Sequence, residues 1–187
     1  MKIGFVGLGA MGKPMACNLL NAGYEVYAFD VVEAAVKEME SKGARGCATA
    51  GELAGKADVI ICSLPNAKIV ENVMCSEGGV FENCKAGTII IDMSSVAPNS
   101  TKAMAKKAAE KGIGYIDAPV SGGVSGAAAG TLTIMVGADG ATFEKVKPVL
   151  DVLGKNIYHV SEVGGGDGLG AAVGEHALAR LEDVGDA

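Results

Sequence analysis

The sequence predicts an α/β domain built on a doubly wound, mostly parallel sheet. Short apolar runs rich in Val and Ile recur along the chain, and segments with helical periodicity separate them. Runs of this kind suit parallel strands that are buried on both faces. The alternation of strand, helix and strand indicates a doubly wound α/β architecture.

The first two thirds of the chain supply five expected strands and two well-marked helices. The strands are expected at residues 3–6, 26–29, 59–64, 88–92 and 114–117. One helix is expected to follow Gly12 and to end at Gly23 as its C-cap. A second is expected to begin with Asn99 or Ser100 as its N-cap and to stop at Gly112.

The pattern changes after Asp117. Residues 130–139 alternate as a strand, residues 141–154 indicate a helix with a proline near its middle, and residues 156–160 indicate one more strand. The sheet is therefore expected to be extended by about two strands. The glycine cluster at 164–170 is the best candidate boundary, which divides the chain into residues 1–163 and residues 164–187.

Composition excludes several function classes. The chain has 187 residues and a net charge of −6, and its lysines form no basic block, so nucleic acid and acidic membranes are not expected as partners. Five cysteines without a C-x-x-C pair and only two histidines argue against a zinc site or a disulfide framework, and favour a cytoplasmic location. The longest apolar run, ADVIICSL, is too short to span a bilayer.

A G-x-G-x-x-G motif follows the first expected strand, with its glycines at Gly7, Gly9 and Gly12. Gly7 permits a tight turn, Gly9 lets the backbone approach a pyrophosphate, and Gly12 lets the next helix pack close to the strand. The N-terminus of that helix would attract the phosphates. A glycine-rich turn without a ligand is the alternative, which the surrounding strand, helix and Asp30 make weaker.

Asp30 closes the second expected strand, about 20 residues after the glycines, where dinucleotide-binding folds carry an acidic residue. Its carboxylate can accept hydrogen bonds from the adenosine ribose and would repel a 2′-phosphate. The next cation is Lys37. We therefore expect NAD rather than NADP as the cofactor; the alternative is that Asp30 only caps the following helix.

Three further loops are expected at the carboxyl ends of later strands, where ligands of such sheets collect. They span residues 63–67, 91–98 and 117–127. Each could be an ordinary turn with Pro or Gly. Because all three would lie along one edge of one sheet, a surface for a nicotinamide ring and a small polar substrate is favoured.

Long motifs give the chain a family resemblance. The segments FVGLGAMGKPMACNLL, SLPN, IDMSS and DAPVSGGVSGAAAGTLTIMVG resemble the β-hydroxyacid dehydrogenases, continuously from about Lys2 to Val163. The resemblance implies a Rossmann-like domain and reversible hydride transfer between a 3-hydroxy acid and its semialdehyde. The substrate would be of the 3-hydroxyisobutyrate, 2-hydroxy-3-oxopropionate or 2-(hydroxymethyl)glutarate type, and the SLPNA and DMSSVAP loops look closest to the last.

The resemblance also assigns residues to the two ligands. The substrate carboxylate would be held by the hydroxyl of Ser121 and by the backbone at Gly122 and Gly123, where a glycine pair allows close approach. The expected cofactor-binding residues are Gly7, Leu8, Gly9, Ala10, Met11, Gly12, Asp30, Leu64, Pro65 and Ser95.

Members of the family carry a lysine early in a long helix that leads into an all-helical C-terminal domain, and that domain completes the active site and the dimer. Here Gly174 stands where the lysine is expected, and Lys155 is the last lysine of the sequence. Loss of a proton-transfer residue costs on the order of 10²- to 10⁴-fold in rate. We therefore expect no catalytic residue in this chain, which reads as truncated and inactive alone.

The residues near the end of the chain do not suggest a replacement. His176 and Arg180 are more simply solvated charges of a short helix, and Asp167 is more simply a loop residue within the glycine cluster. Two other functions remain open: a non-catalytic dinucleotide-binding module, and a remnant that folds but binds nothing well. An apolar surface near the tail is expected to cause some dimerisation or a sticky monomer.

Overall fold

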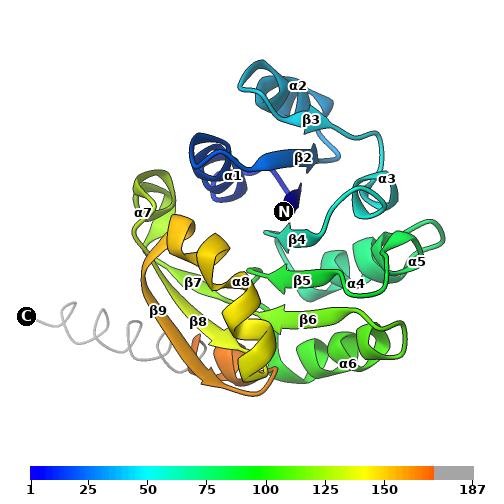
Figure 1. Ribbon diagram of the computed structural model, residues 1–187, viewed down its shortest axis with the longest axis vertical. Helices are drawn as coiled ribbons and strands as arrows, with labels where there is room; N and C mark the ends of the chain where they lie inside the picture. Colours follow the sequence, from blue (N-terminus) through cyan, green and yellow to red (C-terminus); the bar gives the residue numbers. More distant parts are fainter. Residues whose placement is uncertain (171–187) are drawn as a thin grey trace, which may run out of the picture.

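The computed structural model describes residues 1–170, which form a sheet covered by helices on both faces (Figure 1). The strands are β1 (Lys2–Val6), β2 (Glu25–Phe29), β3 (Arg45–Gly46), β4 (Val59–Cys62), β5 (Ile89–Asp92), β6 (Gly114–Asp117), β7 (Val120–Ser121), β8 (Leu132–Gly137) and β9 (Gly154–Ser161). The helices are α1 (Gly12–Asn21), α2 (Glu33–Ser41), α3 (Ala50–Ala54), α4 (Ala67–Cys75), α5 (Val80–Asn83), α6 (Pro98–Ala109), α7 (Gly123–Ala129) and α8 (Gly140–Leu153).

The strand order is β3-β2-β1-β4-β5-β6-β8-β7, with β9 paired to the outer side of β8. β1 to β6 all pair in parallel. The chain reverses its direction of winding at β1, because β2 lies on one side of it and β4 on the other. In open α/β sheets such a switch point forms a crevice at the carboxyl ends of the strands, where ligands bind.

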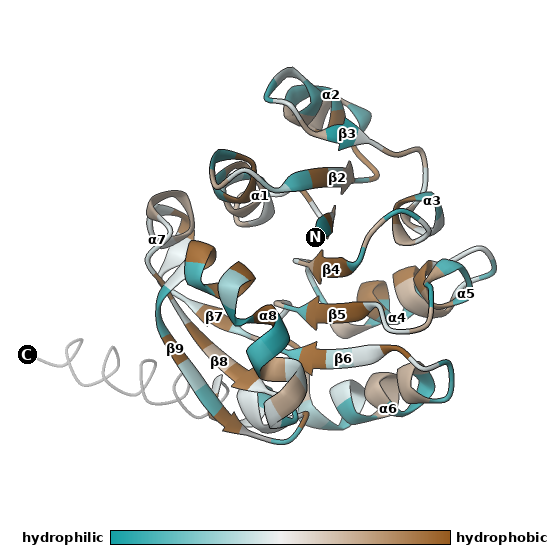
Figure 2. Cartoon of the chain, in the orientation of Figure 1, coloured by the Kyte–Doolittle hydropathy of each residue, from teal (hydrophilic) through white to brown (hydrophobic). Residues whose placement is uncertain are grey.

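Two apolar cores lie on the two faces of the sheet. The first contains side chains of α1, α2, α7 and α8, and the second contains side chains of α3, α4, α5 and α6. Successive strand residues alternate between them: Ile61 belongs to the first core, while Ile60 and Cys62 belong to the second. The central strands are accordingly apolar on both faces, and the polar residues lie on the outer helix surfaces (Figure 2).

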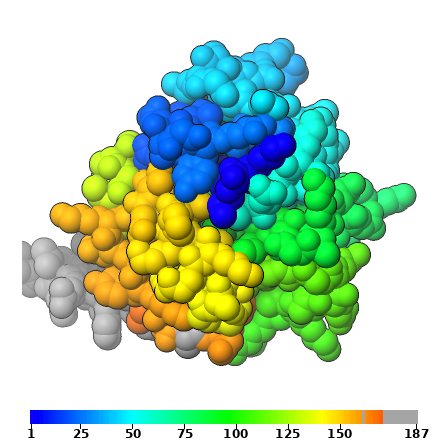
Figure 3. All heavy atoms as spheres, in the orientation of Figure 1, coloured from blue at the N-terminus to red at the C-terminus, as the bar shows by residue number. Residues whose placement is uncertain are grey.

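The last part of the sheet runs in the opposite direction. β8 pairs antiparallel with β6 and with the two-residue β7, and parallel with β9. α8 packs over this extension, and the ring of Phe143 stacks on that of His159 with centroids 4.4 Å apart. In the space-filling view the yellow surface of α8 lies beside the orange surface of β9 (Figure 3). The extension beyond β6 was expected to contain about two strands; β7 is an additional short one.

Most predicted elements are confirmed, with differences at their ends. The strand predicted at 59–64 ends at Cys62, and the short strand β3 was not predicted. The predicted N-cap at Asn99 or Ser100 is wrong, because α6 begins at Pro98 with Ala97 as its N-cap. Proline suits the first position of a helix, since its missing N–H would have no partner there.

The glycine cluster at 164–170 is not a loop throughout: the described chain is helical from residue 165 to residue 170. The division into residues 1–163 and 164–187 stays a prediction. Across residues 1–170, no helix has both the length and the apolar character that crossing a membrane requires.

Candidate functional site

A cavity of about 220 Å³ lies at the switch point, against the carboxyl ends of β1, β2 and β4. It is lined by residues that sequence reasoning had assigned to a cofactor and by apolar neighbours from α4. The assigned residues among its lining are Gly7, Gly9, Asp30, Leu64 and Pro65. The structure therefore brings together residues from three loops that are far apart in the sequence.

The glycines of the G-x-G-x-x-G motif have three different environments. Gly7 has φ +94°, and a Cβ there would lie 2.3 Å from the Ser63 carbonyl oxygen. A Cβ on Gly12 would lie 1.9 Å from the Gly7 carbonyl oxygen. A Cβ on Gly9 would have no heavy atom within 4 Å. Packing within the protein thus explains Gly7 and Gly12, whereas the space beside Gly9 is open toward the cavity.

The carboxylate of Asp30, directly after β2, binds backbone N–H groups of the G-x-G-x-x-G loop and of its own loop. Its Oδ2 accepts a hydrogen bond from the Leu8 N–H at 2.6 Å, and its Oδ1 accepts one from the Val32 N–H at 2.8 Å. The residue is half-buried, and it lines both this cavity and an adjoining one of about 350 Å³. Asp30 is not the N-cap of α2, because that position is Val32. The carboxylate therefore fixes the glycine loop and still faces the crevice.

The start of α1 is suited to an anion. Its N-cap is Met11, and no side chain caps the helix by a hydrogen bond. The first N–H groups of a helix lack intrahelical partners and carry a partial positive charge. Ala10 is exposed next to them. A phosphate group placed over Gly9 would meet these N–H groups.

The Leu64 loop is held from below by a chain of hydrogen bonds that ends in a buried carboxylate. The Leu64 N–H donates to Ser94 Oγ at 3.0 Å, the Ser94 N–H donates to Asp92 Oδ1 at 3.0 Å, and the Tyr115 hydroxyl donates to Asp92 Oδ2 at 2.7 Å. Burial raises the pKa of the Asp92 carboxyl, while its hydrogen bonds from Ser94 and Tyr115 oppose the rise. Sequence reasoning selected Ser95 and missed Ser94, which is 3% exposed.

Leu8, Ala10, Met11 and Gly12 belong to the glycine motif but do not themselves line these cavities, and the remaining predicted site residues lie apart from them. Ser95, Ser121, Gly122 and Gly123 are exposed and line neither cavity. Gly122 and Gly123 have φ values of +132° and +61°, which side-chain-bearing residues rarely adopt. The glycine pair is thus required by the turn between β7 and α7. A role for these residues in binding stays a prediction.

The expectation that Asp167 is a loop residue is wrong. It lies in the helical segment that follows Gly164 and is 4% exposed, and Thr101 Oγ1 donates a hydrogen bond to its Oδ2. The carboxylate of Asp117 accepts from the Gly164 N–H at 2.6 Å and from the Asp167 N–H at 2.8 Å. A carboxylate at the end of β6 therefore caps this helix, which periodicity within the glycine cluster could not indicate.

Burial raises the pKa of Asp167 to about 7, against the opposing hydrogen bond from Thr101. The neighbouring charge of Asp117 raises it further, and burial also raises the pKa of Asp117 itself. Among the described residues, Oδ1 of Asp167 is a buried side-chain oxygen with no hydrogen-bond partner. Gly174, His176 and Arg180 lie outside the described residues. No group of three or more His, Cys, Asp or Glu within residues 1–170 could hold a metal ion.

Comparison with known proteins places this geometry in a family. Residues 2–161 match the family model of the NAD binding domain of 6-phosphogluconate dehydrogenase. The chain is 63% identical over 167 residues to a 2-(hydroxymethyl)glutarate dehydrogenase from Eubacterium barkeri, covering 89% of this chain and 56% of that protein. It is 44% identical over 181 residues to the 2-hydroxy-3-oxopropionate reductase of Escherichia coli, covering 97% of this chain and 61% of that protein.

A solved structure of a related protein has a similar fold. The 3-hydroxyisobutyrate dehydrogenase of Mycobacterium tuberculosis, determined with L-serine, superposes with a TM-score of 0.90 at 34% identity, covering 98% of this chain and 62% of that one. The chain spans less than two thirds of the length of each of these three relatives. The resemblance found in the sequence is thereby confirmed: the chain belongs to the family of the NAD binding domain of 6-phosphogluconate dehydrogenase, and it is an NAD-binding domain of the β-hydroxyacid dehydrogenases.

Proposed function

We propose that this chain binds NAD at the β1 switch point and serves as the cofactor domain of a 3-hydroxy-acid dehydrogenase. The observation that carries the proposal is the open space beside Gly9, next to a cavity that Asp30 lines. Gly7 and Gly12 are explained by internal packing, whereas the lack of a side chain at Gly9 is useful only if something outside the protein approaches the backbone there.

The residues present fit a dinucleotide. The pyrophosphate would lie over Gly9 at the uncapped start of α1, and the adenosine ribose would donate hydrogen bonds to the Asp30 carboxylate. The 2′-phosphate of NADP would instead be repelled by this carboxylate. Lys37, the first cation after Asp30 in the sequence, pairs with Glu33 at 2.7 Å. We therefore propose a preference for NAD over NADP.

When bound, the nicotinamide supplies the group that gives or takes a hydride. Leu64 and Pro65 line the cavity on the β4 side, and Ser95 follows β5, so these residues would flank the ring. Ser121, Gly122 and Gly123 would hold the substrate carboxylate through one hydroxyl and through backbone N–H groups. The identity of 63% to a 2-(hydroxymethyl)glutarate dehydrogenase favours 2-(hydroxymethyl)glutarate among the three proposed substrates.

Residues 1–187 alone are proposed to bind the cofactor without efficient turnover. Proton transfer to or from the substrate oxygen needs a positioned acid or base, and no lysine follows Lys155 in this sequence. A non-catalytic dinucleotide-binding module is the second candidate, because the cavity proposed for the cofactor has no lysine in its lining. Activity restored by a helical partner supplied in trans would favour the enzyme over this module.

Calorimetric titration with NAD and with NADP tests the binding proposal. We expect micromolar binding of NAD and weaker binding of NADP; tighter binding of NADP would overturn the assignment of Asp30. Turnover is then measured with 2-(hydroxymethyl)glutarate, 3-hydroxyisobutyrate and 2-hydroxy-3-oxopropionate. Robust turnover by the 187-residue chain would contradict the reasoning from the lysine, while leaving the binding proposal intact.

A further inference from the structure

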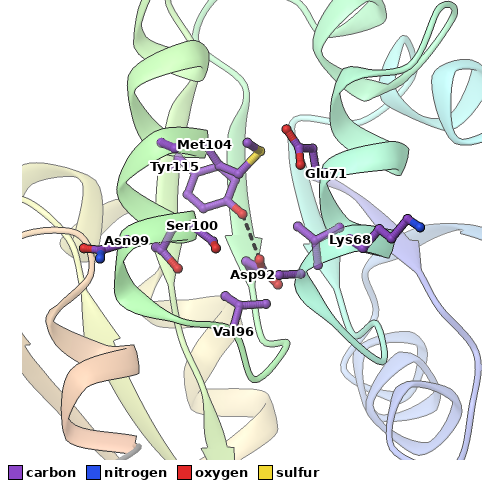
Figure 4. Close-up of a pocket in the computed structure, with 12 residues that line it drawn as sticks. Lys68, Glu71, Asp92, Val96, Asn99, Ser100, Met104 and Tyr115 are labelled. Carbon is purple, nitrogen blue, oxygen red and sulfur yellow. Dashed lines mark hydrogen bonds between the residues drawn. The ribbon is translucent and has the colours of Figure 1, made fainter.

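A third cavity, of about 430 Å³, lies between α4 and α6 (Figure 4). It shares no lining residue with the cavity at the β1 switch point, because α4 separates the two. Ile69 and Val73 of α4 line the switch-point cavity, whereas Val70 and Glu71 line the one beside α6. Its volume is in the range of small-molecule sites. The cofactor site described above does not use it.

The floor of this cavity is formed by a carboxylate and by a tyrosine hydroxyl. Asp92 is 1% exposed and Tyr115 is 5% exposed, and Figure 4 shows the carboxylate and the hydroxyl meeting between the two helices. A tyrosine hydroxyl has one hydrogen, and that of Tyr115 is donated to Asp92 Oδ2 at 2.7 Å. The lone pairs that remain on both groups can be satisfied only by donors. An occupant that presents N–H or O–H groups to the floor would match these acceptors.

The walls are mostly apolar, with the hydroxyls of Ser100 and Thr101 among them, and the nearby amino and amide groups are turned away. Val70, Val96 and Met104 form much of the lining. In Figure 4 the Lys68 amino group and the Asn99 amide point away from Asp92, and a second carboxylate, that of Glu71, lies farther along the cavity. Two carboxylates disfavour an anion. A bound metal is disfavoured too, because no cluster of three metal-ligating side chains exists within the described part of the chain.

We propose that the cavity between α4 and α6 binds a small primary ammonium compound with a short apolar body, whose ammonium group lies against Asp92 and Tyr115. An ammonium group carries three donors and a positive charge, which match the acceptor floor, and its alkyl part matches the apolar walls. A neutral alcohol of the same size could supply one donor but no charge.

The electrostatics of Asp92 agree with a missing counter-charge. Burial raises the pKa of this carboxyl, and the nearby charge of Asp117, which has the same sign, raises it further. A buried carboxylate is stabilised by a paired cation. The Glu71 carboxylate, by contrast, already has a partner, because Lys107 Nζ lies 3.3 Å from its Oε1. The deep end of the cavity is thus the part that lacks a cation.

Titration with n-propylammonium chloride tests the proposal, with 1-propanol and sodium propionate as matched neutral and anionic probes. Backbone amide shifts in nuclear magnetic resonance spectra locate the binding. We expect saturable binding of propylammonium at about 1 mM, at least tenfold tighter than that of propanol, and no binding of propionate. The largest shifts should include Ser94 and Leu64, because Asp92 holds Ser94 and Ser94 holds Leu64.

Variants separate this site from general surface binding. Ala103→Leu fills the cavity from an exposed position of α6 and should weaken propylammonium binding about tenfold or more. Ala109→Leu, on an exposed part of α6 that does not line the cavity, is the control and should bind normally. Asp92→Asn should abolish the preference for the ammonium over the alcohol; if this variant does not fold, Ala103→Leu decides alone.

The proposal is overturned by any of three results. They are no saturable binding of propylammonium, binding unaffected by Ala103→Leu, and equal affinity for propylammonium and propanol. None of these results depends on NAD binding, so the test is independent of the proposed cofactor function.

Discussion

Replacing Gly9 by alanine should remove NAD binding without destabilising the protein. A Cβ at this position would have no heavy atom within 4 Å, and Gly9 is not among the glycines with positive φ. A Gly to Ala change at such a position alters stability by less than about 1 kcal/mol, commonly in the stabilising direction. The added methyl group would occupy the space through which a pyrophosphate approaches the backbone. We expect the affinity for NAD to fall at least tenfold, which corresponds to about 1.4 kcal/mol.

Gly12→Ala, in contrast, should destabilise the protein. Its Cβ would lie 1.9 Å from the Gly7 carbonyl oxygen and 2.9 Å from the Gly7 carbonyl carbon, and neither backbone atom can move without shifting the β1–α1 turn. Overpacking of this kind costs about 1–3 kcal/mol. For a domain of this size, a loss of about 2 kcal/mol lowers Tm by roughly 4–8 °C.

Two measurements on three variants distinguish the roles: urea unfolding for stability and calorimetric titration for NAD affinity. Gly140→Ala is the matched control, since a Cβ at Gly140 also meets nothing within 4 Å and its φ is not positive. It should keep both stability and affinity. If Gly9→Ala binds NAD as tightly as the unmodified chain, the cofactor does not pass over Gly9. If Gly12→Ala is as stable as Gly9→Ala, the packing explanation for Gly12 is wrong.

Three further predictions concern polar side chains that hold the ends of helices or loops in the fold. Ser94→Ala should leave the Leu64 N–H without its acceptor, cost about 1–2 kcal/mol in urea unfolding and weaken NAD binding severalfold in calorimetry; unchanged values of both would contradict the positioning role. Asp139→Ala removes the acceptor of the Thr142 N–H at the start of α8 and should cost about 1 kcal/mol by thermal unfolding, with NAD affinity unchanged. The pKa of Asp167 is about 7 in the folded chain, whereas the ordinary pKa of an aspartate is 3.8, so the free energy of unfolding should fall as pH rises through this interval. Solvent access and local detachment of the helix at residues 165–170 limit the loss of unfolding free energy to about 2 kcal/mol. Asp167→Asn should make the free energy of unfolding less dependent on pH, which urea unfolding at about pH 5 and about pH 8 measures.

The sheet could be predicted because its strands are buried on both faces. Each central strand is a short run of apolar residues, and such runs are visible in the sequence without any knowledge of their partners. β3 and β7 escaped prediction because two residues cannot show a period. The start of α6 was misplaced because Asn99 and Ser100 are good capping residues, whereas the helix begins at Pro98, whose fixed φ suits the first turn.

The switch-point cavity could be anticipated for a different reason. The close backbone contacts at Gly7 and Gly12 admit almost no other residue. These two glycines are therefore explained by contacts with the Ser63 carbonyl oxygen and with the Gly7 carbonyl group. Asp30 follows from its place at the end of β2. Its bond to the Leu8 N–H was not anticipated, because a hydrogen bond between two loops leaves no periodic signal.

Long-range hydrogen bonds that polar side chains make with distant backbone groups or with distant side chains mark the limit of prediction from the sequence. Ser94 and Leu64 are 30 residues apart, Tyr115 and Asp92 are 23 apart, and Asp167 and Asp117 are 50 apart. Ser94 and Asp167 sit in stretches that look like an ordinary turn and a glycine-rich loop, whereas Asp92, Tyr115 and Asp117 lie in predicted strands whose apolar pattern does not indicate these partners. Asp167 was assigned to a loop because its glycine neighbours disfavour a helix, but the Asp117 carboxylate offsets that preference by accepting from the N–H of Gly164, directly before the helix, and from the N–H of Asp167 in its first turn. Local propensity therefore predicts a helix or strand reliably only where no distant side chain binds its end. Side chains that do so, such as Asp92 and Asp117, lie at the ends of β5 and β6.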